Sequence, residues 1–409
     1  MLSADVAVVG AGPAGSAAAI VLARAGRRVV LIDKARFPRD KCCGDGLTTA
    51  ALRRLDGLGL RPGDVASWQP IDGVVIRAPD GRQATFPLPT EGTYAAAARR
   101  VDLDAALVAL AADAGVRVIE GCAVTGAGND LSPGTVQLDT SAERVSARYV
   151  IAADGMWSPM RKAFDARDEP GYLGDWHAIR QYFTGVGPEA AKMWVWFEPD
   201  LIPGYAWSFP LPGGRANVGF GIHRSAGRTT GQMGHQWADL LARSHLAAVL
   251  GPAAHPEGPS KAWPIPARVG RSPLSAAGGR VLFVGDAARA TDSMTGEGIG
   301  QALETAEMAS LAILAAGPHA PQRAAAGYGR TIGRSLVVDD RLCRVLSRLL
   351  GRPNPRWMGP LASSDWTRRN FARWMFEDYP RALMATPRRW RWGALHAPPP
   401  YPAGAGTAS

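Results

Sequence analysis

The chain has 409 residues, of which 46% are hydrophobic and 20% are charged, and its formal net charge is +10. This composition excludes a collagen, a coiled coil, a disulfide-stabilised miniprotein and a wholly disordered chain. No run of about 20 apolar residues is present, so no membrane span is predicted. The first residues lack a basic region, so no signal peptide is predicted.

The chain begins with a strand, a turn, a helix and a second strand. An apolar strand is predicted over residues 4–9, an Ala-rich helix over 13–25 and a second strand over 27–33. Gly26 stands where the C-terminus of a helix favours glycine. Such a unit of about 30 residues is typical of a parallel α/β domain.

The remaining predicted elements belong to segments of different composition. Residues 34–94 are irregular, with short alternating pieces, whereas residues 170–270 are rich in aromatic residues, Pro and Gly and predict a mostly antiparallel sheet. Further strands are predicted at 116–121, 135–140, 147–154 and 280–286, further helices at 101–114, 297–316 and 322–350, and a disordered tail at 397–409.

The first turn predicts a dinucleotide-binding site. Gly10-Ala11-Gly12-Pro13-Ala14-Gly15 matches GxGxxG between a strand and a helix, and Asp33, followed by Lys34, ends the next strand. Gly10 permits the tight turn, Gly12 lets the backbone approach a pyrophosphate, and Gly15 lets the helix pack on the sheet. The helix N-terminus offers N–H groups to phosphates, and Asp33 would accept hydrogen bonds from ribose hydroxyls.

Two later motifs suggest a second ligand-binding edge. Asp154-Gly155 closes one strand and is followed by Arg161 after a Ser-Pro turn. Asp286 closes another strand, and Gly296-Glu297-Gly298-Ile299 opens a helix. An acid at the end of a strand followed by a Gly-rich helix start suits a sugar chain and ring atoms.

These three motifs, in this order and spacing, resemble the FAD-dependent enzymes of the para-hydroxybenzoate-hydroxylase type. The resemblance covers about residues 1–320 and implies that Asp286 binds the ribityl and pyrophosphate region, while Gly298 and Ile299 face the flavin ring. Arg100 matches an arginine that contacts FAD in that family, although a solvated charge at a helix start is the alternative. The implied FAD contacts are Gly10, Gly12, Pro13, Ala14, Gly15, Asp33, Lys34, Cys43, Gly44, Gly46, Arg100, Val124, Asp154, Gly155, Asp286, Gly296, Gly298 and Ile299.

Only one GxGxxG is found, so no second domain for a nicotinamide is predicted. NAD(P)H would visit transiently, or another reductant would reduce the flavin. The lack of CxxC argues against a disulfide reductase, and no Cys/His cluster has the spacing of a metal site, so no metal is predicted.

Two further segments are similar to the geranylgeranyl reductase family. The box at 37–46 (FPRDKCCGDG) matches its FPRxKxCGxG motif, and 204–210 (GYAWSFP) followed by 217–219 (NVG) matches its YxWxFP…VG motif. Members of that family saturate double bonds of prenyl chains in archaeal lipids, chlorophyll and menaquinone. The resemblance implies that Cys43 lies against the isoalloxazine and that Tyr205 and Trp207 line a tunnel for the chain.

The implied chemistry is hydride transfer from reduced flavin to one alkene carbon and protonation of the other. The candidate catalytic residues are Cys43, Tyr205 and Trp207: Cys43 and Tyr205 are candidate acids, and Trp207 would line the tunnel beside the reacting bond. The alternatives are a buried structural thiol for Cys43 and ordinary sheet packing for Tyr205 and Trp207. The adjacent Cys42 and Cys43 are not predicted to form a disulfide, because such a bond is strained.

The sequence departs from the family at two positions near the expected flavin. Ser293 replaces a common Pro, and Arg289 replaces a small residue, which questions the shape of the pocket. An FAD-dependent monooxygenase or epoxidase acting on an aromatic or isoprenoid substrate is therefore the alternative function. A flavin halogenase is disfavoured because no Lys occurs between Lys41 and Lys162. A flavin or lipid carrier is a fourth hypothesis.

The C-terminal segment 341–393 contains twelve Arg against three acidic residues, together with five Trp. Arg with Trp suits a membrane–water interface, from which a lipid substrate would be reached; a packed helical cap is the alternative, and no nucleic acid partner is expected. With four cysteines and no export signal, the protein is predicted to be cytoplasmic, at the inner face of the membrane.

The predicted fold class is α/β, with a Rossmann-type FAD-binding domain, an inserted mixed or antiparallel substrate sheet and a helical C-terminus. The predicted domains are FAD-binding (1–60, 95–165 and 270–320), substrate-binding (61–94 and 166–269), a helical cap (321–396) and the disordered tail (397–409).

Overall fold

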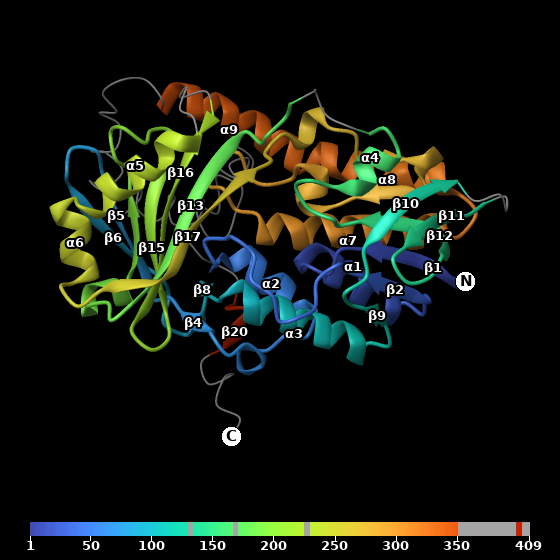
Figure 1. The fold of residues 1–409 in the computed structure, drawn as a ribbon, viewed down its shortest axis with the longest axis horizontal. Coiled ribbons are helices and arrows are strands. Elements are labelled where there is room, and N and C mark those ends of the chain that lie inside the picture. Colours follow the sequence, from blue (N-terminus) through green and yellow to red (C-terminus); the bar gives the residue numbers. More distant parts are fainter. Residues whose placement is uncertain (130–133, 167–170, 225–229, 351–397, 403–409) are drawn as a thin grey trace.

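The computed structural model describes residues 1–129, 134–166, 171–224, 230–350 and 398–402. Two large sheets stand side by side, each covered by helices (Figure 1). The first sheet contains the chain start, and the second is built from the middle of the chain. The α/β class with an inserted mixed sheet is confirmed.

The first sheet is largely parallel at its centre. β1 pairs in parallel with β2 and β12, while β19 and β11 pair with the second and first halves of β12. The central strands are apolar throughout because both faces are covered. The strands are β1 (Leu2–Val9), β2 (Val29–Ile32), β9 (Arg117–Ile119), β10 (Val124–Asn129), β11 (Val136–Thr140), β12 (Val145–Ala152), β18 (Ser275–Ala276) and β19 (Val281–Phe283).

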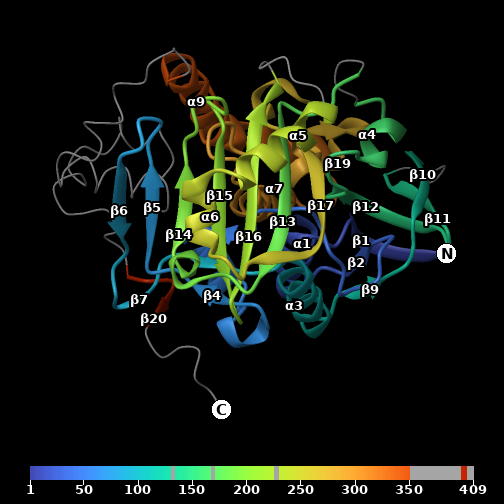
Figure 2. The same ribbon diagram turned by 60° about the vertical axis from the view of Figure 1, so that its left-hand side comes forward.

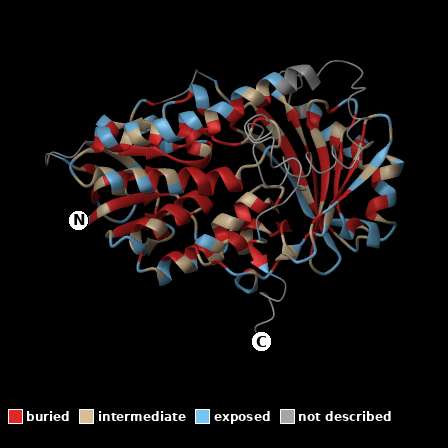
Figure 3. Ribbon diagram, turned by 180° about the vertical axis from the view of Figure 1, so that it is seen from behind, coloured by how far each residue is buried: buried red, intermediate tan, exposed pale blue. Residues whose placement is uncertain are grey.

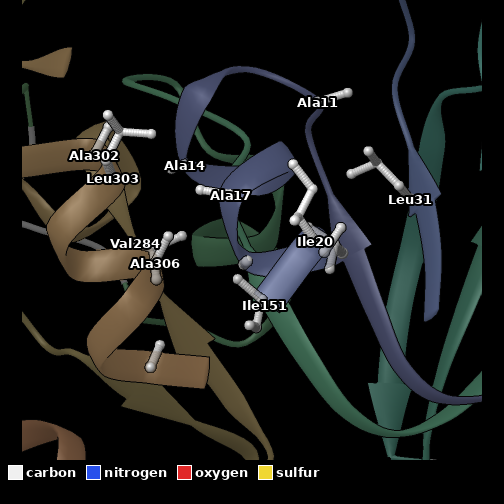
Figure 4. Packing of buried hydrophobic residues seen from close by; sticks show 14 of the residues in the cluster. Ala11, Ala14, Ala17, Ile20, Leu31, Ile151, Val284, Ala302, Leu303 and Ala306 are labelled. Carbon is white, nitrogen blue, oxygen red and sulfur yellow. The ribbon is translucent and has the colours of Figure 1, made fainter. Parts of the chain in front are cut away.

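Helices on the first sheet position the Gly-rich turns. Pro13 opens α1 at a position where its missing N–H costs nothing. Ala14 and Ala17 face Ala302 and Ala306 of α7, and these small side chains let the two helices lie close together (Figure 4). The helices are α1 (Pro13–Arg24), α2 (Thr49–Gly57), α3 (Arg100–Asp113), α4 (Pro159–Ala163), α7 (Ile299–Ala316) and α8 (Pro321–Arg334).

The second sheet has the order β17-β13-β16-β15-β14-β5-β6. All its pairs are antiparallel except β14 with β5. Figure 3 shows its central strands as largely buried. The strands are β5 (Gly73–Arg77), β6 (Gln83–Pro87), β13 (Trp176–Thr184), β14 (Met193–Trp196), β15 (Tyr205–Leu211), β16 (Arg215–His223) and β17 (His255–Ile265).

The two faces of the second sheet serve different purposes. Because side chains alternate along a strand, Trp194, Ala206 and Phe220 enter one hydrophobic core. α5 (Thr230–Leu241) and α6 (Ser244–Leu250), which the sequence did not predict, cover that face (Figure 2). The other face, carrying Tyr205 and Trp207, is turned toward the first layer.

The predicted boundary at residue 61 needs correction. Val65 is buried in the core of the first layer, and the strand β4 (Gln69–Pro70) pairs with β8 (Ala96–Ala97), which also pairs with β3 (Gly46–Leu47). Val65 and Trp68 therefore pack with the first layer, whereas Ile71, just before β5, joins the core beneath β5 and β14.

The prediction of a disordered tail is wrong for residues 398–402. β20 (Tyr401–Pro402) pairs with β7 (Gly92–Thr93), and Tyr401 is only 1% exposed. Its hydroxyl donates to the Leu60 carbonyl oxygen at 3.0 Å, and its ring meets Trp68 edge-on. A buried aromatic residue thus anchors this segment.

The predicted helix 322–350 is two helices, α8 and α9 (Leu336–Leu350), which meet at Ser335. Most of the Arg- and Trp-rich segment lies outside the described residues. Across the described ranges, no helix is long and apolar enough to cross a membrane.

Candidate functional site

A large cavity lies between the two layers. It holds about 2400 Å³ of space, counted with the solvent at its mouth, and is lined by the first turn, the loop before β3, the start of α7 and one face of the second sheet. The predicted site residues that line it are Gly12, Pro13, Ala14, Cys43, Gly44, Gly46, Arg100, Gly155, Tyr205, Trp207, Asp286, Gly296, Gly298 and Ile299.

The first turn leaves room only where a ligand would approach. A Cβ on Gly10 would lie 2.3 Å from the Ala153 carbonyl oxygen, and a Cβ on Gly15 would lie 1.7 Å from the Gly10 oxygen. A Cβ on Gly12 would meet nothing closer than the Arg39 guanidinium at 3.6 Å. Since α1 starts here without a side-chain cap or an acid in its first turn, its N–H groups are available to an anion.

The other six predicted FAD contacts do not line the cavity: Gly10, Gly15, Asp33, Lys34, Val124 and Asp154. Asp33 accepts hydrogen bonds from the Ala11 and Ala35 N–H groups at 2.7 and 2.8 Å, so it fixes the turn. Asp154 accepts from the Ser158 hydroxyl and the Met160 N–H, at 2.7 and 2.8 Å, and burial raises the pKa of its carboxyl. Lys34 is exposed, and Val124 packs against the first core. Their contacts with FAD remain predictions.

A buried arginine stands beside the turn. Arg100 donates twice to the Asp104 carboxylate, at 2.7 and 2.8 Å, and Arg39 reaches the same carboxylate at 2.8 Å. Burial works against the charge of Arg100, but Asp104 more than compensates and raises the pKa of the guanidinium. Arg100 is thus a fixed cation at the cavity wall, not a solvated helix-start charge.

Asp286 and the start of α7 line another part of the same cavity. Although burial opposes it, Lys41, 3.1 Å away, holds the pKa of Asp286 below its ordinary value. Gly296 has a positive φ of 72°, and α7 begins after Gly298 without a side-chain cap from that residue. Burial raises the pKa of Glu297, which accepts from the Gly300 N–H at 2.6 Å, to about 7.

The backbone of the loop that leads into β3 lies close to aromatic rings of the second sheet. A Cβ on Gly46 would lie 3.0 Å from the Phe209 ring, and one on Gly44 would lie 3.4 Å from it. Cys42 and Cys43 are free thiols. Burial raises the pKa of Cys42 to about 12 and also raises the pKa of Cys43, so neither is an activated thiolate.

The second sheet supplies an apolar wall. Tyr205 donates its hydroxyl hydrogen bond to the Thr295 carbonyl oxygen, and burial raises the pKa of its phenol. Trp207 donates to Asn217 Oδ1 at 3.1 Å. The aromatic and aliphatic side chains of this wall are Trp176, Ala178, Met193, Val195, Phe197, Ile202, Pro203, Tyr205, Trp207, Phe209, Trp263, Pro264, Ile265 and Pro266.

Several residues that line the cavity were not predicted from the sequence. Asp45, Trp176, Arg180 and Trp263 all line the cavity. The alternation of Trp176, Ala178 and Arg180 along β13 could have placed them on one face. Which of the two faces meets the cavity depends on α5 and α6, which were not predicted.

The two residues that depart from the family both lie in the segment between β19 and α7. Arg289 has a left-handed backbone, with φ 59°, which favours glycine. Its guanidinium donates to the Met156 carbonyl oxygen at 2.5 Å and lies over the Tyr172 ring. Ser293 is buried, and its hydroxyl has no partner within the described residues.

Arg161, which follows the Asp154-Gly155 motif, holds the chain together and does not line the cavity. Its buried guanidinium donates to the carbonyl oxygens of Ala287 and Pro273 at 2.6 and 2.7 Å, and also to that of Ala166. The described residues contain no group of His, Cys, Asp and Glu arranged for a metal ion.

Known proteins resemble this chain over most of its length. Residues 3–326 match the model of the FAD binding domain family. A menaquinone reductase from Mycobacterium tuberculosis is 34% identical over 329 residues, which cover 75% of this chain and 76% of that protein. A digeranylgeranylglycerophospholipid reductase from Methanopyrus kandleri is 31% identical, covering 73% and 77%. A geranylgeranyl bacteriochlorophyll reductase-like protein from Thermoplasma acidophilum has the same fold, with a TM-score of 0.75, 22% identity, and coverage of 88% and 91%.

The residues present fit FAD. The open space over Gly12, the uncapped N-terminus of α1 and the buried Arg100 suit a pyrophosphate. The start of α7 and the loop before β3 flank the same cavity, with room for a flat ring system. The chain therefore belongs to the geranylgeranyl reductase family of FAD-dependent oxidoreductases.

Proposed function

We propose that this enzyme reduces carbon–carbon double bonds of an isoprenoid chain. The observation that carries the proposal is the apolar, aromatic-rich wall that the second sheet presents to the FAD site. A chain of isoprene units has no hydrogen-bonding groups, so such a wall binds it by excluding water. The similarity to reductases named for menaquinone and geranylgeranyl lipids supports the same substrate class.

The cavity floor leaves a path for a flexible chain. Gly221 pairs with Tyr205 on one side and Ala178 on the other, and all three line the cavity. A Cβ on Gly221 would have no neighbour closer than 3.8 Å. Because Gly221 and Ala178 are small, an isoprenoid chain would fit over them, between Tyr205 and Trp263.

When bound and reduced, FAD would supply hydride to one alkene carbon. This chain's residues bind and orient: Arg100 and the α1 N-terminus hold the phosphates, and Asp286 holds hydroxyls. Tyr205 and Trp207 orient the alkene, because their polar atoms are tied to Thr295 and Asn217 and their rings are fixed. Cys43 stands at the loop that the flavin ring would contact.

The reductant and the route of the substrate belong to the same proposal. NAD(P)H or another diffusible donor reduces the flavin in a separate visit to the cavity, because the chain has one GxGxxG. The Arg- and Trp-rich segment 341–393 provides peripheral contact with an anionic membrane, the source of a lipid substrate. This contact places the enzyme at the inner face of the cytoplasmic membrane.

Anaerobic turnover with mass spectrometry tests the function. Dithionite-reduced enzyme is incubated with a digeranylgeranylglycerol lipid and, separately, with a menaquinone carrying an unsaturated side chain, whose head group is reoxidised to the quinone before the mass is measured. The proposal expects a gain of two mass units for each reduced bond. No gain without oxygen, followed by a gain of sixteen with air and NADPH, would overturn it in favour of the monooxygenase alternative.

A further inference from the structure

Asp45 is a buried carboxyl group at the cavity wall. The residue has no exposed surface and lines the cavity two residues after Cys43. Its φ of 66° is left-handed, a conformation that Asp tolerates better than most residues. Its backbone N–H donates to the Cys43 sulfur at 3.4 Å. The backbone therefore fixes the carboxyl beside the loop that would contact the flavin.

The two oxygens of this carboxyl have different surroundings. Oδ2 accepts from the Tyr182 hydroxyl at 2.7 Å and from Asn217 Nδ2 at 2.8 Å. Oδ1 is buried and has no hydrogen-bond partner among the residues that the structure describes. Since Oδ2 already accepts two hydrogen bonds, Oδ1 is the oxygen left to carry a proton.

The donors to Oδ2 are themselves held in place. Arg180 and Arg99 lie over the Tyr182 ring, 4.1 and 4.5 Å from its centroid. Asn217 also donates to the Cys43 carbonyl oxygen and accepts from Trp207. The network thus links the carboxyl to the Cys43 loop and to the apolar wall.

Charged and titratable groups on several elements face Asp45. Burial raises its pKa to about 6, while Tyr182, Asn217, Arg180 and Arg100 pull it downward. The neighbouring Cys43 thiol and Tyr182 phenol have pKa values raised by burial. Among Asp45, Cys43 and Tyr205, Asp45 has the pKa nearest to neutral pH, where an acid catalyst works best.

Resting on the proposed function, we infer that Asp45 is the proton source of the reduction: its Oδ1–H protonates the alkene carbon that does not receive hydride. The alkene gains hydride, which carries two electrons, from reduced FAD and a proton from Asp45. Two C–H bonds form, the π bond and the Oδ1–H bond break, and oxidised FAD and the Asp45 carboxylate result. Water entering through the cavity mouth returns the proton before the next turnover.

The first test replaces the acid with its amide. Flavin reoxidation is followed in anaerobic single turnovers of reduced wild type and Asp45→Asn with the digeranylgeranylglycerol lipid, which has no quinone group to oxidise the flavin. The wild-type rate is expected to fall as pH rises through about 6, and Asp45→Asn is expected to be slower by about 10²-fold or more, without that pH dependence. Asp80→Asn, at an exposed position away from the cavity, is the matched control.

The second test does not depend on turnover or on the stability of Asp45→Asn. In protein labelled with ¹³C at aspartate carboxyl groups and loaded with FAD, NMR is expected to show one carboxyl titrating near pH 6. Tyr182→Phe removes a donor to the ionised form, so this midpoint and that of the rate should both move upward. Tyr149→Phe, which loses a hydrogen bond to the Gly317 carbonyl oxygen, should move neither.

The outcomes separate this inference from the proposed function. If wild-type enzyme reduces neither chain, the proposed function fails. If wild type reduces a chain, three results would overturn only the role of Asp45. Asp45→Asn could react as fast as wild type, it could show the same pH dependence as wild type, or no aspartate carboxyl could titrate near pH 6.

Discussion

At the residue scale, the turn between β1 and α1 could be predicted because its glycines obey steric rules. The roles of Asp33 and Asp154 could not, because a carboxylate at a strand end can face a ligand or its own backbone. Both accept backbone N–H groups, as local turns demand. Asp45 was missed because only the register of β13 and β16 brings Tyr182 and Asn217 to it.

Gly15→Ala tests the steric reading of that turn. The added methyl would lie 1.7 Å from the Gly10 carbonyl oxygen, so the helix must shift away from the sheet. We expect purified protein to lose most of its FAD, measured as the ratio of flavin to protein absorbance. Gly57→Ala, where a Cβ meets nothing within 4 Å, is the control. Equal flavin content in both variants would contradict the account.

At the element scale, alternation of side chains along the strands builds the substrate wall. The sequence predicted a sheet in 170–270, but β14 and β15 were not resolved as separate strands, and α5 and α6 were missed. These helices are stabilised by their apolar contacts with the sheet, including Trp237 and Leu246. Helix propensity, which depends only on the local sequence, does not reflect these tertiary contacts, so it did not predict the two helices.

Gly221→Leu tests the floor of the wall. Its side chain would occupy open cavity between Ala178 and Tyr205, so an isoprenoid chain should no longer lie flat. We expect anaerobic saturation of the digeranylgeranylglycerol lipid to fall by at least about tenfold, with unchanged flavin content. Wild-type turnover by a flavin-loaded variant would show that the chain binds elsewhere.

Tyr401→Ala tests the anchoring of the chain end. Removing a buried aromatic ring should lower the free energy of unfolding by about 3 kcal/mol, measured by urea titration of the FAD-loaded protein. Tyr401→Phe, which loses only the hydrogen bond to Leu60, should cost about 1 kcal/mol. If Tyr401→Ala were as stable as wild type, the packing of β20 would not contribute to stability.

At the scale of the whole molecule, two layers meet around one cavity. The first layer brings the helix N-termini and Arg100, and the second brings the apolar wall. Motifs predicted the first layer because its turns have strict sequence requirements. The apolar wall was predicted mainly from the family resemblance. Its residues are distant in the sequence and come together only through the strand order of the second sheet.

The most direct test of the function follows the flavin itself. Reduced enzyme is mixed without oxygen with an unsaturated prenyl chain, and the flavin absorbance is recorded, with a saturated chain of equal length as the control. We predict that the oxidised spectrum returns only with the unsaturated chain, in step with the product two mass units heavier. A flavin that stays reduced with both chains until oxygen is admitted would contradict the account.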